Sequence, residues 1–153
     1  MPFGIKINAT DVLFSLLVRE RDGWTCVRCK RKHEKTDNTS DNSHYWGRGR
    51  KSVRWDFDNC DTLCKLPCHA GPNSQTPKNF GWEYQKQIAG YNGSAVDGEY
   101  TQFKKKQLGK KFDELMIRAH TPKKADEKSL RIGFKLELKK IEREKNSQIF
   151  GSR

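Results

Sequence analysis

The sequence predicts an α+β domain whose cysteine-rich centre is flanked by an N-terminal helix and a helical C-terminal arm. Two cysteine pairs, Cys26/Cys29 and Cys64/Cys68, have the short internal spacings of zinc ligands. Apolar residues recur with the period of a helix before the first pair and again after residue 100, and an alternating pattern between the pairs has the period of a strand. These observations together predict a zinc-stabilised scaffold with helices on either side of it.

The length of 153 residues is that of one domain with appendages. Residues 1–99 contain both cysteine pairs and many polar loops, whereas residues 100–153 are basic and have helical periodicity. We therefore expect a zinc-containing core over residues 1–99 and a basic helical extension over residues 100–153 that packs on this core.

Positive charge dominates the composition, with 31 Lys and Arg residues against 19 Asp and Glu residues. Such a field attracts phosphate polymers, so nucleic acid is the expected partner. No apolar stretch approaches the roughly 20 residues that cross a bilayer, and the apolar run at 12–18 lacks a signal-peptide cleavage site. No membrane role is expected, and in the expected cytoplasmic location reduced cysteine pairs are more often metal ligands than disulfides.

The first helix is predicted over residues 10–21. Thr10 is the expected N-cap, and Gly23 is expected to lie just beyond its end. Its apolar side chains share one face, which we expect to pack on the zinc module: Val12, Leu13, Leu16 and Leu17.

The segment between the cysteine pairs predicts a hairpin. Residues 30–42 are polar and predict an exposed loop that leads to His44. Residues 47–51 predict a flexible basic turn, and residues 53–58 alternate apolar and polar side chains as a half-buried strand does. His44 and Asn59 are therefore expected on or beside the two arms of the hairpin.

The rest of the chain is predicted to be loop followed by helix. Residues 70–100 are punctuated by Pro and Gly and predict mostly loop, with one helical turn at 82–89. Helices are then predicted over 100–120, with Gly109 as an internal break, and over 126–146.

The four paired cysteines, Cys26, Cys29, Cys64 and Cys68, supply the ligand set of a closed tetrahedral zinc site. Such a site contributes on the order of 10 kcal/mol to folding. His33 is a competing ligand, and a site that used it would free Cys68. We expect Cys60 to be a small buried apolar side chain, because no sequence feature argues for a depressed thiol pKa.

Three further residues, His44, Asn59 and His69, could act together on a phosphodiester. Hydrolysis needs a base, a cation that stabilises developing charge, and a group that orients the base. A neutral histidine can be the base, an amide oxygen can hold the base or bind the cation, and His69 adjoins a cysteine ligand that fixes its position. Each histidine taken alone is more often a satisfied surface or core residue, so the combination carries the prediction.

Taken together, the cysteine pairs, the segment Ser43-His44-Tyr45, Asn59 and the final His69 resemble the HNH, or ββα-metal, endonucleases over about residues 24–69. The segments at 43–45, 54–56 and 58–60 are most similar to the phage NinG/Rap-type recombination nucleases. The resemblance implies a zinc-stabilised ββα-metal core and a catalytic Mg2+ or Mn2+ ion. It also implies cleavage of DNA, including branched recombination or replication intermediates, and a location in the host cytoplasm for a phage-encoded protein.

The same resemblance implies a role for each site residue. His44 would be the general base, Asn59 the orienting or metal-binding residue, and His69 a ligand of the divalent cation. Ser43 departs from the family, in which many members have an Asp or His ligand at this position, and Asp41 could reach the cation in its place. Without a cation, the scaffold would be a noncatalytic zinc-containing nucleic-acid-binding module or a recombination accessory protein, which is the alternative function.

Residues beside the hairpin are expected to contact DNA phosphates and one base: Arg48, Arg50, Lys51, Arg54 and Trp46. Core packing is the alternative for Trp46 and the favoured reading for Trp55. The lysines at 104–106 and 110–111 form a second positive cluster, which is either a solvated helix face or an extension of the DNA track.

Overall fold

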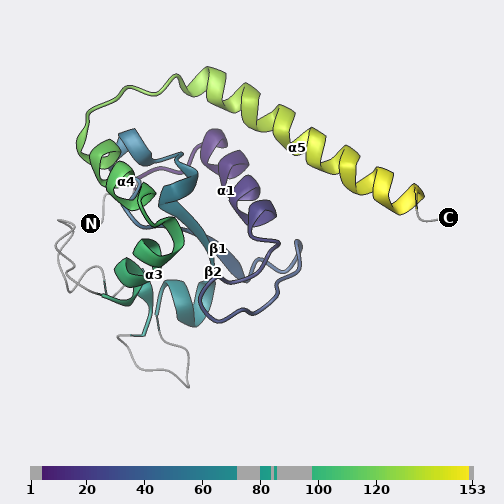
Figure 1. Cartoon of the computed structure of the whole chain (residues 1–153). Helices are drawn as coiled ribbons and strands as arrows, with labels where there is room; N and C mark the ends of the chain where they lie inside the picture. Colours follow the sequence, from purple (N-terminus) through teal and green to yellow (C-terminus); the bar gives the residue numbers. More distant parts are fainter. Residues whose placement is uncertain (1–4, 72–79, 84, 86–97, 152–153) are drawn as a thin grey trace.

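The computed structural model describes residues 5–71, 80–83, 85 and 98–151, and its architecture is α+β, as predicted. Two strands, β1 (Ser40–His44) and β2 (Cys60–Cys64), pair antiparallel and place His44 opposite Cys60. Helices lie on both sides of this hairpin (Figure 1). The predicted loop segments at 72–79 and 90–97, and most of the predicted helical turn at 82–89, lie outside the described residues.

The described part of the chain contains the following helices and turns. The helices are α1 (Ala9–Arg21), α3 (Glu99–Leu108), α4 (Lys111–His120) and α5 (Glu127–Phe150). Three short turns accompany the hairpin, η1 (Lys51–Val53) and η2 (Phe57–Asn59) between its strands and η3 (Lys65–His69) after β2.

Helix α1 begins one residue earlier than predicted, and its N-cap is Asn8 instead of Thr10. The Asn8 side chain accepts the backbone N–H of Asp11 at 2.9 Å, and the Asp11 carboxylate accepts the backbone N–H of Asn8 at 2.8 Å. This reciprocal capping box satisfies two N–H groups at the helix start. Thr10 lies inside the first turn, where its hydroxyl donates to Glu127 at 2.9 Å.

The strand predicted over residues 53–58 is wrong, because this segment forms the end of η1, a turn and the start of η2. The Asp56 side chain accepts the backbone N–H of Asp58 at 3.0 Å, which closes a local turn that competes with extended backbone. The first strand of the hairpin, β1, starts at Ser40, which lies inside the segment 30–42 that was predicted to be an exposed loop.

The two faces of the hairpin pack on different helices. On one face Cys60 joins a core cluster with Phe14, Leu17 and Val18 of α1 and Phe134 of α5. On the other face Leu63 belongs to a larger cluster that includes the cysteine side chains and residues of α3 and α4. The hairpin is therefore the middle layer of the described structure, with α1 outside one face and α3 and α4 outside the other.

Helices α3 and α4 share this larger core with the hairpin. Tyr100, Phe112 and Leu115 are buried in the same cluster as Tyr45 and Leu63. The residues after 99, which were predicted as an extension packing on the core, thus contribute side chains to the core itself. No helix in the described ranges is long and apolar enough to cross a membrane.

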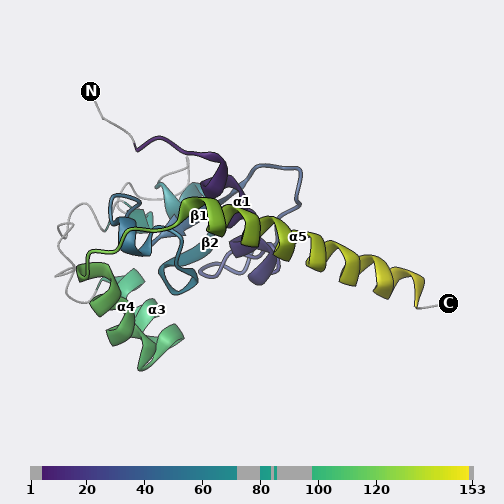
Figure 2. The ribbon, with the colours of Figure 1, turned by 90° about the horizontal axis from the view of Figure 1, so that it is seen from above.

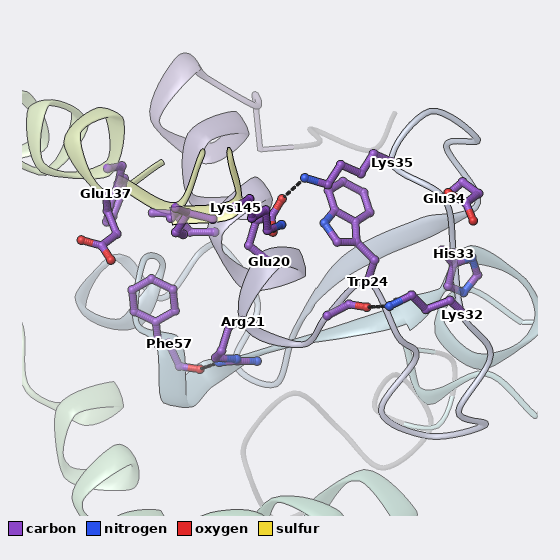
Figure 3. A pocket seen from close by; sticks show the side chains of 14 residues that line it. Glu20, Arg21, Trp24, Lys32, His33, Glu34, Lys35, Phe57, Glu137 and Lys145 are labelled. Carbon is purple, nitrogen blue, oxygen red and sulfur yellow. Dashed lines mark hydrogen bonds and ion pairs between the residues drawn. The ribbon is translucent and has the colours of Figure 1, made fainter. Parts of the chain in front are cut away.

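Helix α5 lies along α1 and is fastened near the end of α1 by Glu20. The Glu20 carboxylate is 10% exposed and pairs with Lys145 of α5 and with Lys35 of the loop after α1. These residues line a groove of about 910 Å³ between α1, residues 23–35 and α5, with Trp24 at its wall (Figure 3). Glu20 therefore joins three segments of the chain at one point.

Acid should weaken the ion pairs of Glu20 with Lys145 and Lys35. Burial raises the pKa of Glu20, but hydrogen bonds from Lys145 and Lys35 outweigh burial and lower it from 4.5 to about 2. A carboxylate with a lowered folded-state pKa stabilises the fold above its unfolded pKa of 4.5, and this stabilisation is lost as the pH falls towards 2. Because both lysines are about half exposed, we expect Glu20→Gln to cost only about 1 kcal/mol near neutral pH.

This expectation is checked by urea unfolding of both proteins between about pH 6 and pH 3. The difference in free energy of unfolding between the wild type and Glu20→Gln should shrink as the pH falls. Glu144→Gln, which changes an exposed carboxylate of α5, is the control and should show no such trend. A difference for Glu20→Gln that does not change with pH would contradict the assignment.

Candidate functional site

The four paired cysteines converge on one point, as predicted. Cys26 and Cys29 lie in the loop after α1, Cys64 ends β2, and Cys68 lies in η3. Their four sulfur atoms all lie within 4.8 Å of one another. A tetrahedral zinc ion with bonds of about 2.3 Å sets sulfur atoms roughly 3.8 Å apart, so this donor set fits a structural zinc ion.

The electrostatics of the cluster agree with a cation site. A hydrogen bond from the Cys68 thiol lowers the pKa of Cys26 to about 4, whereas burial raises the pKa of Cys64 to about 12. Crowded thiols in a buried site thus resist carrying several negative charges together. A bound Zn2+ ion would offset that repulsion and would hold all four cysteines as thiolates.

The alternative ligand His33 does not belong to this cluster. Its Nδ1 atom lies 2.6 Å from the hydroxyl of Thr39, and the ring is 4% exposed. Cys60 also lies apart, buried against α1, where burial raises its thiol pKa. Cys60 is therefore a small buried apolar residue, as predicted.

His44 ends β1 and has an imidazole held in one orientation. Its Nε2 atom lies 3.0 Å from the backbone carbonyl oxygen of Arg54, and the residue is 7% exposed. A carbonyl oxygen only accepts hydrogen bonds, so Nε2 carries the proton and the basic lone pair is on Nδ1. Backbone geometry thus selects the tautomer that a base acting through Nδ1 requires.

Asn59 immediately precedes β2 and braces the loop that follows His44. Its carbonyl oxygen accepts the backbone N–H of Trp46 at 2.7 Å, and its amide donates to the backbone carbonyls of Trp46 and Val53 at 2.9 and 3.0 Å. The side chain is completely buried. These contacts are to backbone groups of Trp46 and Val53, so both roles predicted for Asn59, orienting the base and binding the cation, stay predictions.

Asp41 and His69 are brought together across the hairpin. The Nδ1–H of His69 donates to the Asp41 carboxylate at 2.9 Å, and the Nε2 of His69 lies 3.8 Å from the carboxylate of Glu83. Burial raises the pKa of Asp41, but the hydrogen bond from His69 outweighs burial and leaves the pKa below its ordinary value. Glu83 is a site residue that the sequence did not indicate, because it lies in the predicted helical turn at 82–89 and belongs to none of the recognised motifs.

The geometry of β1 places His44 and the pair formed by Asp41 and His69 on opposite faces of the hairpin. Asp41 and His44 are three positions apart on β1, so their side chains project from opposite faces of the hairpin. His44 lies on the face of Cys60, towards α1, and Asp41 lies on the face of Leu63. Ser43, which precedes His44, is completely buried.

Two of the residues predicted to contact DNA, Arg54 and Trp46, are instead used for contacts within the protein. The Arg54 guanidinium, 11% exposed, forms a salt bridge with Asp11 at 2.5 Å, so its charge is already paired. Trp46 is 3% exposed and its ring lies beneath the guanidinium of Arg50, 4.8 Å from the ring centroid. Trp46 is thus a core residue, which corrects the prediction that it stacks on a base.

The remaining basic residues of this loop are closer to solvent. Lys51 is exposed, whereas Arg48 and Arg50 are partly buried, and Arg50 also donates to the carbonyl of Ala119 at 3.3 Å. Trp55 is partly buried, and its indole N–H donates to Asp11 at 2.9 Å, in agreement with the packing role favoured for it.

The second predicted positive cluster, the lysines at 104–106 and 110–111, also contains both buried and exposed residues. Lys104 is completely buried, and its ammonium donates to the equally buried Asp61 carboxylate at 2.8 Å. Tyr100 and Gln107 donate to the same carboxylate at 3.1 and 2.8 Å. Lys104 is therefore a structural residue, whereas the neighbouring lysines at 105–106 and 110–111 are exposed.

Comparisons of the chain with protein-family models, curated proteins and solved structures found no match. Function is therefore inferred from the site residues themselves.

Proposed function

We propose that this protein is a divalent-cation-dependent DNA endonuclease of the HNH, or ββα-metal, type. The observation that carries the proposal is the hydrogen bond from His44 Nε2 to the Arg54 carbonyl, which leaves the basic lone pair on Nδ1. The backbone carbonyl fixes the tautomer of His44, and Asn59 braces the loop beside it. This is the arrangement that a general base needs to deprotonate water.

In this proposal His44 activates the attacking water, His69 is a ligand of the cation, and Asp41 orients the ring of His69. His44 Nδ1 removes a proton from water, and the hydroxide attacks the phosphorus of the scissile phosphodiester. The bond from phosphorus to the leaving sugar oxygen breaks, and this oxygen takes a proton from solvent. His69 and Glu83 would hold the cation, and Asp41 would fix the His69 ring through its Nδ1–H, as carboxylates do behind metal-bound histidines. When bound, a Mg2+ or Mn2+ ion would stabilise the negative charge that develops on the phosphate oxygens.

The cysteine cluster has a structural part in the same proposal. It ties the loop after α1 to the end of β2 and to η3, and η3 contains His69. Within the cluster region, the backbone N–H of Val27 also donates to the carbonyl of Thr62 at 2.9 Å. Zinc would therefore set the position of His69 relative to the hairpin without taking part in the chemistry.

The proposal is tested by cleavage of matched linear and four-way DNA substrates with added Mg2+ or Mn2+. We expect cleavage to require one of these ions. Loss of the histidine ligand in His69→Ala should raise the ion concentration for half-maximal cleavage by about 10-fold to 100-fold. His120→Ala, an exposed histidine of α4, is the matched control and should leave the ion response unchanged.

One observation favours a second candidate function. His44 faces α1 and is 7% exposed, whereas Asp41 and His69 lie on the other face of the hairpin. A base and a cation separated by a strand fit a noncatalytic zinc-containing nucleic-acid-binding module. DNA binding without cleavage in either ion would establish this alternative and contradict the nuclease proposal.

A further inference from the structure

One side of α5, called the underside, packs on the body of the protein over most of the helix. Phe134 is buried against Phe14, with their ring centroids 5.4 Å apart, and Leu130, Leu138 and Ile141 pack on the same cluster. Lys145 continues this side of the helix with its ion pair to Glu20. Helix α5 is therefore held along one side for most of its length, and its C-terminal end projects beyond the remaining elements (Figures 1 and 2).

The opposite side of α5 is a basic stripe. At 100° per residue, five cationic side chains fall on the half of the helix that faces solvent, and all are exposed: Lys128, Lys135, Lys139, Lys140 and Arg143. The acidic residues of α5 lie on its flanks and underside. Among the described residues, the ion pairs formed by basic groups of α5 are those of Arg131 with Glu127 and of Lys145 with Glu20. The basic stripe thus presents a row of positive charge that acidic side chains of this helix do not neutralise.

We infer that the basic stripe of α5 is a docking surface for the phosphate backbone of duplex DNA, an inference that rests on the DNA substrate of the proposed function. From Lys128 to Arg143 the stripe extends about 22 Å at roughly 1.5 Å per residue. That length matches roughly six base pairs at about 3.4 Å each. Because the underside is docked, the row keeps its spacing and orientation when it meets the duplex, which lowers the entropic cost of binding.

The apolar residues on this face do not suit a lipid surface. Ile132 and Leu136 are 53% and 62% exposed, and as i,i+4 neighbours they form one small apolar pair among the basic side chains. A helix that binds in a membrane interface buries a continuous apolar face in the lipid. The continuous apolar face of α5 already packs on α1, so electrostatic contact with a polyanion is the interaction left to the outer face.

The test compares two triple variants in which equal charge is removed from exposed lysines and arginines. Lys135→Gln/Lys139→Gln/Arg143→Gln removes charge from the stripe, and Lys106→Gln/Lys110→Gln/Lys111→Gln removes the same charge near α3 and α4. Binding to a short fluorescent duplex is measured by anisotropy over a range of salt concentrations, without divalent cation. The stripe variant should lower the slope of log K against log salt by about 2 to 3, since each lost phosphate contact removes about 0.9.

The control variant should change that slope by less than about 1. Equal losses in both variants would overturn the inference, because they would show that net charge and not this face determines binding. An unchanged slope in the stripe variant, with wild-type cleavage intact, would also overturn it while leaving the proposed function standing. If the wild type binds anionic lipid vesicles through the stripe and binds no duplex, the DNA inference is wrong and the proposed function fails with it.

Discussion

Replacing Cys26 or Cys64 by Ser will unfold the protein and release one zinc ion per chain. Each residue supplies one of four sulfur atoms that lie within 4.8 Å of one another, and a hydroxyl is a much weaker zinc ligand than a thiolate. A structural zinc site contributes on the order of 10 kcal/mol, which is comparable to the entire stability of a typical domain, about 5 to 15 kcal/mol. Metal analysis of the purified protein, together with circular dichroism, measures both effects.

Cys60→Ala is the matched control for these variants. Cys60 is equally buried, but it packs against α1 and lies outside the sulfur cluster. The control should keep one zinc per chain and lose only the modest stability that removal of a small buried side chain costs, about 1 kcal/mol. A purified wild type that contains no zinc, or a zinc content that depends on Cys60, would refute the metal assignment.

His44→Ala will reduce DNA cleavage by a factor of at least about one hundred while leaving zinc content and DNA affinity intact. The magnitude is that of losing a general base. The hydrogen bond from Nε2 to the Arg54 carbonyl makes Nδ1 the basic nitrogen of the ring, and the substitution removes this nitrogen. Single-turnover cleavage at saturating enzyme separates this loss from any change in binding.

His33→Ala is the matched control, because His33 is a buried histidine that also uses one ring nitrogen for a hydrogen bond. It should retain cleavage in proportion to its folded fraction. If His44→Ala cuts DNA at the wild-type rate, His44 is not the base and the nuclease mechanism proposed for this hairpin is wrong.

The parts of the fold that the sequence could predict are those determined by local pattern or by covalent spacing. The spacing within each cysteine pair predicted the cluster, because a short loop between two cysteines is enough to bring both sulfur atoms to one metal ion. The helix predicted over 100–120 was given an internal break at Gly109, and α3 and α4 are separated at this residue, where φ is +54°. Glycine adopts that left-handed conformation without steric cost.

The parts that the sequence could not predict depend on partners distant in the chain. Strand β1 reads Ser-Asp-Asn-Ser-His and has no apolar alternation, yet all its residues except Asp41 are buried between two layers. The alternation at 53–58 belongs to turns held by side chains, in which Arg54 and Trp55 bind Asp11 of α1. The role of Lys104 was also hidden, because its partner Asp61 lies forty-three residues earlier.

The buried contact between Lys104 and Asp61 has a consequence for how this protein can be divided. Two opposite charges with no exposed surface are stable only as a pair, and either one left alone in the interior costs several kcal/mol. A cut between the hairpin and α3 would remove Lys104, Tyr100 and Gln107 from Asp61. The carboxylate would then keep only the longer ion pair with Arg21, at 3.8 Å. The motif that resembles a small nuclease is consequently not a detachable module in this chain. We therefore expect the hairpin to lose stability when it is separated from α3, so the two would have to be expressed and redesigned together.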